Sequence, residues 1–129
     1  KHNFIQSSCN NYADFKKWDT KMIGYGISIS GLKINTKEYN EKSYVSLARE
    51  KDYHSNILTP NRKKILEDFI KSQSSIENIY NIGMLYAENS SELSGYIVSP
   101  SNEKQLYDII RFLKIANTVN FDRKFFDNF

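Results

Sequence analysis

The residues best suited to chemistry gather in one short segment, SYVSLAREKDYH, at positions 43–54. The segment begins with the alternation of a strand and ends in a run of charged and titratable side chains, which includes a guanidinium, an ammonium, a phenol and an imidazole. We predict catalytic roles for Arg49, Tyr53 and His54, and a substrate-binding role for Lys51. The alternative interpretation is a strand that ends in a solvated loop.

Cleavage of RNA through its own 2′-hydroxyl would explain why these side-chain types stand together. That reaction needs a base, an acid and a cation beside the phosphate, and it needs no metal. Arg62 and Lys63 lie in the first turn of an expected helix, whose N-terminus adds to their attraction for phosphate, so we predict that they bind substrate. In size and in its mixture of helices and strands, the chain resembles the small RNase toxins of interbacterial competition systems. This resemblance implies a toxin or effector domain that acts on RNA.

A second resemblance rests on the order of short fragments over residues 2–92. His2 in KHNFI is followed by Gly31-Leu32 in SISGLK, then by Ser46 in YVSLAR, and late by Glu92 in SSELSGYIV. This order is similar to the pattern of the ADP-ribosyltransferase superfamily, in which a histidine, a Gly-Leu pair and a small hydroxyl residue precede a catalytic glutamate. The resemblance therefore implies an effector that acts on a nucleotide.

The transferase-like resemblance also implies a role for each matching side chain. His2 and Ser46 would hold the nicotinamide ribose, and Tyr44 or Tyr53 would stack on the nicotinamide ring. Glu92 would be the catalytic residue that stabilises the developing oxocarbenium charge. NAD would then be a substrate and not a bound cofactor.

Missing motifs exclude several other chemistries. The two histidines and the single cysteine, Cys9, form neither a zinc motif nor a disulfide. No phosphate-binding glycine loop occurs, and neither does a Gly-x-Ser-x-Gly nucleophile elbow. We therefore expect no metal and no bound cofactor, and we exclude the P-loop, classical dehydrogenase and serine-hydrolase classes.

Charge is divided unevenly along the chain. Residues 1–66 hold twelve Lys or Arg against six Asp or Glu, whereas residues 67–129 hold six against nine. The basic half favours a phosphate-bearing ligand such as RNA or a nucleotide. The net charge of +3 is smaller than a dedicated duplex-DNA binder usually carries, so no duplex-DNA signature is present.

The alternative function is binding without catalysis. Aromatic residues make up 14% of the chain, and Tyr and Arg are favoured at the hot spots of protein interfaces. The scarcity of histidine and the missing metal motifs favour this class over an enzyme. An immunity or inhibitor protein would use such a surface to block a toxin, and the acidic half would suit a basic nuclease. A cognate protein partner is therefore expected beside RNA or a nucleotide.

The hydrophobic pattern predicts an α+β domain with a mainly antiparallel sheet and helices packed on it, in the order α-β-β-α-β-β-α. The predicted elements are a helix at 10–26, strands at 27–34 and 43–48, a helix at 58–72, a hairpin of strands at 77–89 and 93–100, and a helix at 101–116. Thr59 and Pro60 mark the start of the second helix, and Ser99 or Ser101 is the expected cap of the last one.

Residues 1–129 are expected to form a single globular domain with an aromatic tail at about 120–129. Four of the last nine residues are Phe, so we expect this tail either to dock on the body or to form an interaction patch. No apolar run approaches the roughly 18 residues that a membrane span needs. The abundance of Asn, Lys, Ile, Ser and Tyr is typical of AT-rich genomes such as those of bacterial mobile elements or viruses. We expect a soluble domain that is cytoplasmic or delivered into a target cytoplasm.

Overall fold

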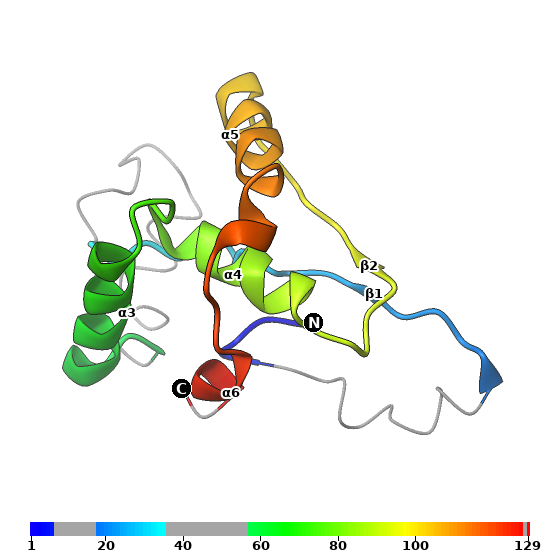
Figure 1. Cartoon of the computed structure of the whole chain (residues 1–129), viewed down its shortest axis with the longest axis horizontal. Coiled ribbons are helices and arrows are strands. Elements are labelled where there is room, and N and C mark those ends of the chain that lie inside the picture. The colour runs from blue at the N-terminus through cyan, green and yellow to red at the C-terminus, as the bar shows by residue number, and fades with distance from the viewer. Residues whose placement is uncertain (7–17, 36–56, 128) are drawn as a thin grey trace.

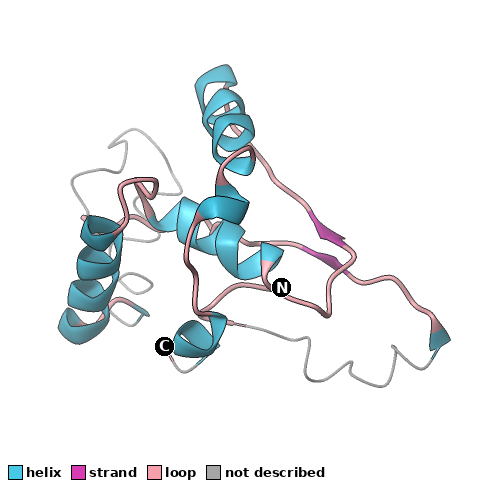
Figure 2. Ribbon diagram, viewed as in Figure 1, coloured by secondary structure: helices cyan, strands magenta, loops and turns pink. Residues whose placement is uncertain are grey.

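The computed structural model describes residues 1–6, 18–35, 57–127 and 129 (Figures 1 and 2). The described elements are β1 (Ile23–Gly24), α3 (Pro60–Ser72), α4 (Ile79–Glu88), β2 (Gly95–Tyr96), α5 (Glu103–Leu113), the 3-10 helix η3 (Ala116–Thr118) and α6 (Arg123–Asp127). Helices account for 46% of the described residues, and strands for 5%. The α+β prediction with a mainly antiparallel sheet is therefore wrong, because the described sheet has two short strands and they are parallel.

Helix α4 runs through the centre of the fold, and eight of its ten residues are buried (Figure 1). Asn78 caps its first turn reciprocally with Asn81, each side-chain oxygen accepting a hydrogen bond from the other residue's backbone N–H. A helix that is buried on nearly every side shows a weak 3.6-residue period, and a short, mainly apolar run of this kind also fits a buried strand. The strand predicted at 77–89 is wrong for this reason.

Helices α3 and α5 form where the sequence pattern predicts helices. Helix α3 begins at Pro60, and the Thr59 hydroxyl accepts a hydrogen bond from the backbone of Arg62 at 3.4 Å. Helix α5 is capped by Asn102, whose side chain accepts from Gln105 N at 2.9 Å, and not by Ser99 or Ser101 as predicted. These helices were recognisable because each has a polar face as well as an apolar one.

The two strands pair in a way that the sequence pattern did not predict. Residue Ile23 of β1 lies opposite Gly95 of β2, and Gly24 lies opposite Tyr96, in parallel register. The expected hairpin is wrong because its first arm is helix α4, which leaves β2 to pair with a strand from the beginning of the chain. Strand β1 itself lies within the predicted helix at 10–26, of which residues 10–17 lie outside the described part of the chain.

The strand predicted at 27–34 is also wrong, because most of this segment forms a tight turn. Three successive residues, Ile29, Ser30 and Gly31, have positive φ angles of 51°, 58° and 74°. The turn is closed by backbone hydrogen bonds, including one of 2.9 Å from Gly31 N to Ser28 O. The turn buries the apolar side chains that alternate with polar ones in this segment, and Ile29 is 1% exposed. The alternating pattern therefore comes from a buried turn and not from a strand.

The aromatic tail docks on the body of the protein. Phe126 of α6 is fully buried, and its ring lies 4.9–5.5 Å from the rings of Phe4, Phe69 and Phe121. Phe121 stacks on Phe126 with an interplanar angle of 9°, while the other two rings meet it edge-on. The tail therefore joins the first residues of the chain to α3.

A glycine in α4 allows the turn to approach the helix. A Cβ atom at Gly83 would lie far inside van der Waals contact with the Ile27 carbonyl oxygen, which is backbone and so cannot rotate away. Ile27 is itself 1% exposed, so its peptide is fixed between buried groups. The close contact between α4 and the turn therefore depends on the missing side chain at position 83.

We expect Gly83→Ala to lower the free energy of unfolding by about 3 kcal/mol, because the added methyl group must push α4 away from the turn. A loss of stability would be diagnostic of this contact, because Gly→Ala inside a helix normally raises the free energy of unfolding by up to about 1 kcal/mol. Urea denaturation followed by circular dichroism would measure the change. Gly95→Ala is the matched control, because its Cβ would meet its nearest neighbour at an ordinary 3.6 Å. Equal stability of the Gly83 variant and the parent would show that the contact is absent.

Candidate functional site

Most of the predicted site residues lie outside the described part of the chain. These residues are Tyr44, Ser46, Arg49, Lys51, Tyr53 and His54. Three predicted residues, Arg62, Lys63 and Glu92, are described, as are His2, Gly31 and Leu32 from the transferase-like fragments. The structure therefore places Glu92 and the two cations of α3 relative to the rest of the fold.

Arg62 fastens the tail to α3. Its Nε donates to the Phe129 carbonyl oxygen at 2.7 Å and its Nη1 donates to the Ile57 carbonyl oxygen at 3.2 Å. The guanidinium also lies 5.4 Å from the centre of the Phe129 ring. Lys63 donates to the Asn35 side chain at 3.0 Å. Both cations thus contact neighbouring residues of the fold, and neither is brought to Glu92.

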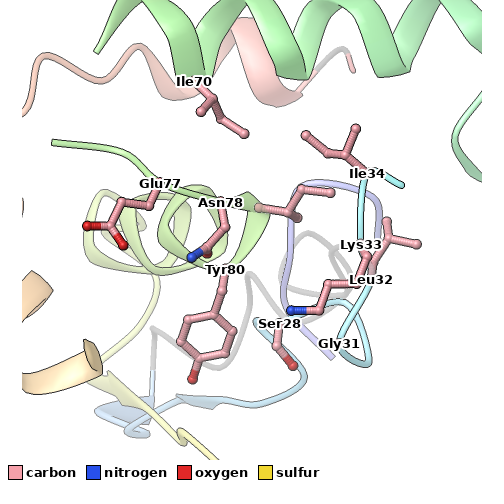
Figure 3. Close-up of a pocket in the computed structure, with 10 residues that line it drawn as sticks. Ser28, Gly31, Leu32, Lys33, Ile34, Ile70, Glu77, Asn78 and Tyr80 are labelled. Carbon is pink, nitrogen blue, oxygen red and sulfur yellow. The ribbon is translucent and has the colours of Figure 1, made fainter. Parts of the chain in front are cut away.

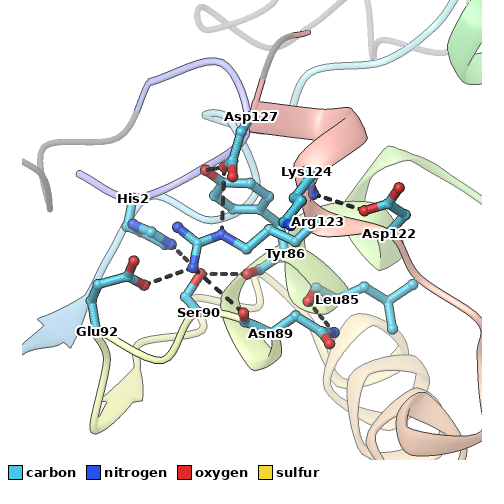
Figure 4. Close-up of polar contacts among 10 residues, drawn as sticks. All are labelled: His2, Leu85, Tyr86, Asn89, Ser90, Glu92, Asp122, Arg123, Lys124 and Asp127. Atoms are coloured by element: carbon cyan, nitrogen blue, oxygen red, sulfur yellow. Dashed lines mark hydrogen bonds and ion pairs between the residues drawn. The ribbon is translucent and has the colours of Figure 1, made fainter.

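Glu92 forms an ion pair with Arg123, which comes from α6 (Figure 4). The Glu92 Oε2 atom lies 2.7 Å from Arg123 Nη1, and the two side chains are 23% and 20% exposed. A carboxylate oxygen of Asp127 lies 3.4 Å from Arg123 Nε, and the Tyr86 ring lies 5.2 Å from the guanidinium carbon. Arg123 is therefore held by two carboxylates and an aromatic face, and it remains cationic.

Arg123 was missed by sequence reasoning because its partner lies 31 residues away along the chain. One signal was available, namely a basic residue inside a tail whose four Phe residues predict docking. A cation carried into a half-buried position needs a carboxylate beside it. Glu92 is the acidic residue for which the sequence predicts a catalytic role.

His2 and Ser90 form a buried polar pair beside this cluster. Ser90 Oγ lies 2.6 Å from the Tyr86 carbonyl oxygen and 2.6 Å from His2 Nε2. A carbonyl oxygen only accepts, so the hydroxyl hydrogen points to Tyr86, and His2 Nε2 must carry a proton that it donates to Ser90. His2 therefore does not act as a base for Ser90 in this arrangement. With exposures of 1% and 3%, both side chains are also closed to a substrate.

Burial sets the protonation of two groups in the cluster. Burial, reinforced by the positive charge of Arg123, lowers the pKa of His2 below its ordinary value of 6.5, so the ring is neutral at pH 7. Burial also raises the pKa of Tyr86 to about 12. The hydroxyl of Tyr86 therefore keeps its proton and donates it to Asp127 at 2.7 Å.

A cleft of about 570 Å³ opens beside Arg123. Its described lining consists of Asn3, Phe4, Ile5, Tyr86, Glu92, Arg123, Lys124 and Asp127. Two carboxylates and two cations face this space, and the apolar side chains come from the first residues of the chain. The volume falls within the range of roughly 300–1,000 Å³ that is usual for small-molecule sites.

A smaller pocket of about 100 Å³ lies between residues 28–34 and the start of α4 (Figure 3). Gly31 and Leu32 line this pocket and not the cleft. Of the transferase-like fragments, the structure therefore brings His2 and Glu92 into one cluster and places the Gly-Leu pair elsewhere. A space of this size admits a few water molecules but no nucleotide.

Within the described ranges, no three His, Cys, Asp or Glu side chains are grouped as a metal site would need. Among the same residues, no helix is both long and apolar enough to cross a membrane. Comparison with family models, with curated proteins and with solved structures finds no match. The function must therefore be argued from the cleft itself.

His2 should make the stability of the protein depend on pH. The unfolded chain binds a proton at His2 near pH 6.5, whereas the folded chain resists protonation, so stability should fall as the pH drops below 6.5. We expect His2→Gln to flatten this dependence, because an amide can still donate to Ser90 but does not titrate. Urea denaturation of both proteins above and below pH 6.5 would measure the difference. Parallel pH profiles would contradict a buried neutral histidine.

Proposed function

We propose that the cleft beside Arg123 binds a phosphate-bearing ligand, and that the protein is a small toxin or effector domain that acts on RNA or a nucleotide. The observation that supports this function best is that Glu92 and Arg123 face one cleft of nucleotide-compatible size, next to Lys124. A guanidinium beside a carboxylate supplies both a phosphate contact and a group that can take a proton or stabilise a cation.

Before a ligand binds, Glu92 occupies the guanidinium that the ligand phosphate would contact. Phosphate oxygens make strong hydrogen bonds to a guanidinium, so a ligand phosphate can replace Glu92 at Arg123 Nη1. The released carboxylate would then lie beside the ligand. Glu92 would accept a proton from a ribose hydroxyl in an RNase-type reaction, or would stabilise an oxocarbenium ion in a transferase-type reaction.

His2 serves as a positioning residue in this proposal. Its hydrogen bond to Ser90 holds the loop that follows α4, two residues before Glu92. The Ser90 hydroxyl donates in turn to the carbonyl oxygen of Tyr86 in the last turn of α4. The loop therefore presents Glu92 to the cleft from a buried anchor, while Arg49 and His54 remain predicted contributors from the segment at 43–54.

We expect Glu92→Gln to reduce turnover on the order of 100-fold, because the amide neither accepts a proton as a base nor carries negative charge. Turnover would be measured on single-stranded RNA and on NAD in parallel, so that loss on one substrate assigns the reaction. Glu67→Gln in α3 is the matched control and should behave like the parent, because Glu67 does not line the cleft.

Binding can be tested separately from turnover. The parent should bind ADP or inorganic phosphate in calorimetry, and Arg123→Lys should weaken this binding because an ammonium cannot make the paired hydrogen bonds of a guanidinium. Circular dichroism would establish that the variant is folded. A parent protein that neither binds these probes nor turns over RNA or NAD would refute the proposed function.

A further inference from the structure

Helix α5 carries a second apolar face that the described part of the chain leaves exposed. Ile109 and Phe112 are the buried residues of this helix and pack into the core. Figure 1 shows α5 projecting from the rest of the described chain. Its other large apolar side chains are exposed by 42–67%, and these are Leu106, Tyr107, Ile110 and Leu113. Such a row on one short helix is typical of an interaction surface and not of scattered surface residues.

The centre of this face is a line of four exposed residues that we call the α5 seam. Glu103, Tyr107, Ile110 and Lys114 recur at intervals of four, three and four residues, so they lie in one row along the helix. The row has an acid at its N-terminal end, two apolar residues in the middle and a base at its C-terminal end. Neither Glu103 nor Lys114 makes an ion pair within the described part of the chain.

The charges on the flank of α5 beside the seam are engaged within the molecule. Lys104 pairs with Asp108 at 2.7 Å, and Arg111 pairs with Glu77 at the start of α4 at 2.7 Å. The Arg111 contact and the buried side chains of α5 fix its orientation on the body. The α5 seam is therefore presented on a preformed support, which reduces the entropy lost when a partner binds.

We propose that the α5 seam binds the α5 seam of a second copy of this chain, with the two helices antiparallel. In this arrangement Glu103 of each copy faces Lys114 of the other, and Tyr107 of each faces Ile110 of the other. The surface is thus complementary to itself under two-fold symmetry, as a C2 dimer requires. The antiparallel arrangement also sets the helix dipoles in opposite directions. A parallel pair would instead bring like charges together at both ends.

The seam of a single helix is small for a protein interface, so we expect a dimer that dissociates in the micromolar range. Sedimentation velocity of the full chain over a concentration series should show the sedimentation coefficient rising from monomer to dimer. Ile110→Glu should abolish the dimer, because it places a carboxylate in the apolar centre of the seam. Lys104→Gln is the matched control, because Lys104 lies outside the α5 seam and pairs with Asp108 of the same helix, and this variant should dimerise like the parent.

Charge reversal tests the antiparallel register. Glu103→Lys and Lys114→Glu should each weaken dimerisation at least several-fold, whereas the double variant should restore it, because each new pair again has opposite charges. In a parallel dimer like charges would face each other at both ends in the parent and in every variant, so the single variants would not weaken dimerisation. The proposal is overturned by a chain that stays monomeric at every concentration, by a dimer that survives Ile110→Glu, or by a double variant that stays weak. Circular dichroism of each variant would establish that helix content is unchanged.

Discussion

The burial of α4 on all its sides is the constraint on which the rest of the structure depends. Eight of its ten residues are buried, and they share one hydrophobic core with side chains of the turn at 27–31, of helices α3 and α5 and of the aromatic tail. On one side even a methyl group is excluded, because the Ile27 carbonyl oxygen occupies the space above Gly83. The strained turn is kept in place by this packing, since positive φ at a β-branched residue such as Ile29 is unfavourable by itself.

The position of the cleft follows from the end of this helix. The last turn of α4 supplies the Tyr86 carbonyl oxygen to Ser90, and Ser90 in turn accepts from His2. The tail then returns to the same place, where Phe126 is buried and Arg123 meets Glu92. Residues from the beginning, middle and end of the described chain thus converge because all three are packed against one helix.

Sequence patterns predicted the elements with two unlike faces and failed where the environment is uniform. Helices α3 and α5 carry caps and a polar side, so their periods were readable. Helix α4 is buried at eight of its ten residues, and the turn at 27–31 buries an alternating pattern that is usually typical of a strand. In the cleft, a short fragment singled out Glu92 as a candidate, but Arg123 is set beside it by the docking of the tail. Local sequence carries little information about a contact between two residues that lie 31 positions apart along the chain.

The two carboxylates around Arg123 have different physical roles. Asp127 belongs to α6 itself and accepts the Tyr86 hydroxyl at 2.7 Å, so it ties the end of that helix directly to α4. Phe126 adds a fully buried ring to the same attachment. The docking of α6 therefore has contacts besides the one with Glu92, which reaches Arg123 from a separate loop and through a different nitrogen from Asp127. A ligand that displaces Glu92 would leave the tail in place. Glu92 is therefore the member of the cluster whose contact with Arg123 is separate from the attachment of α6 to α4.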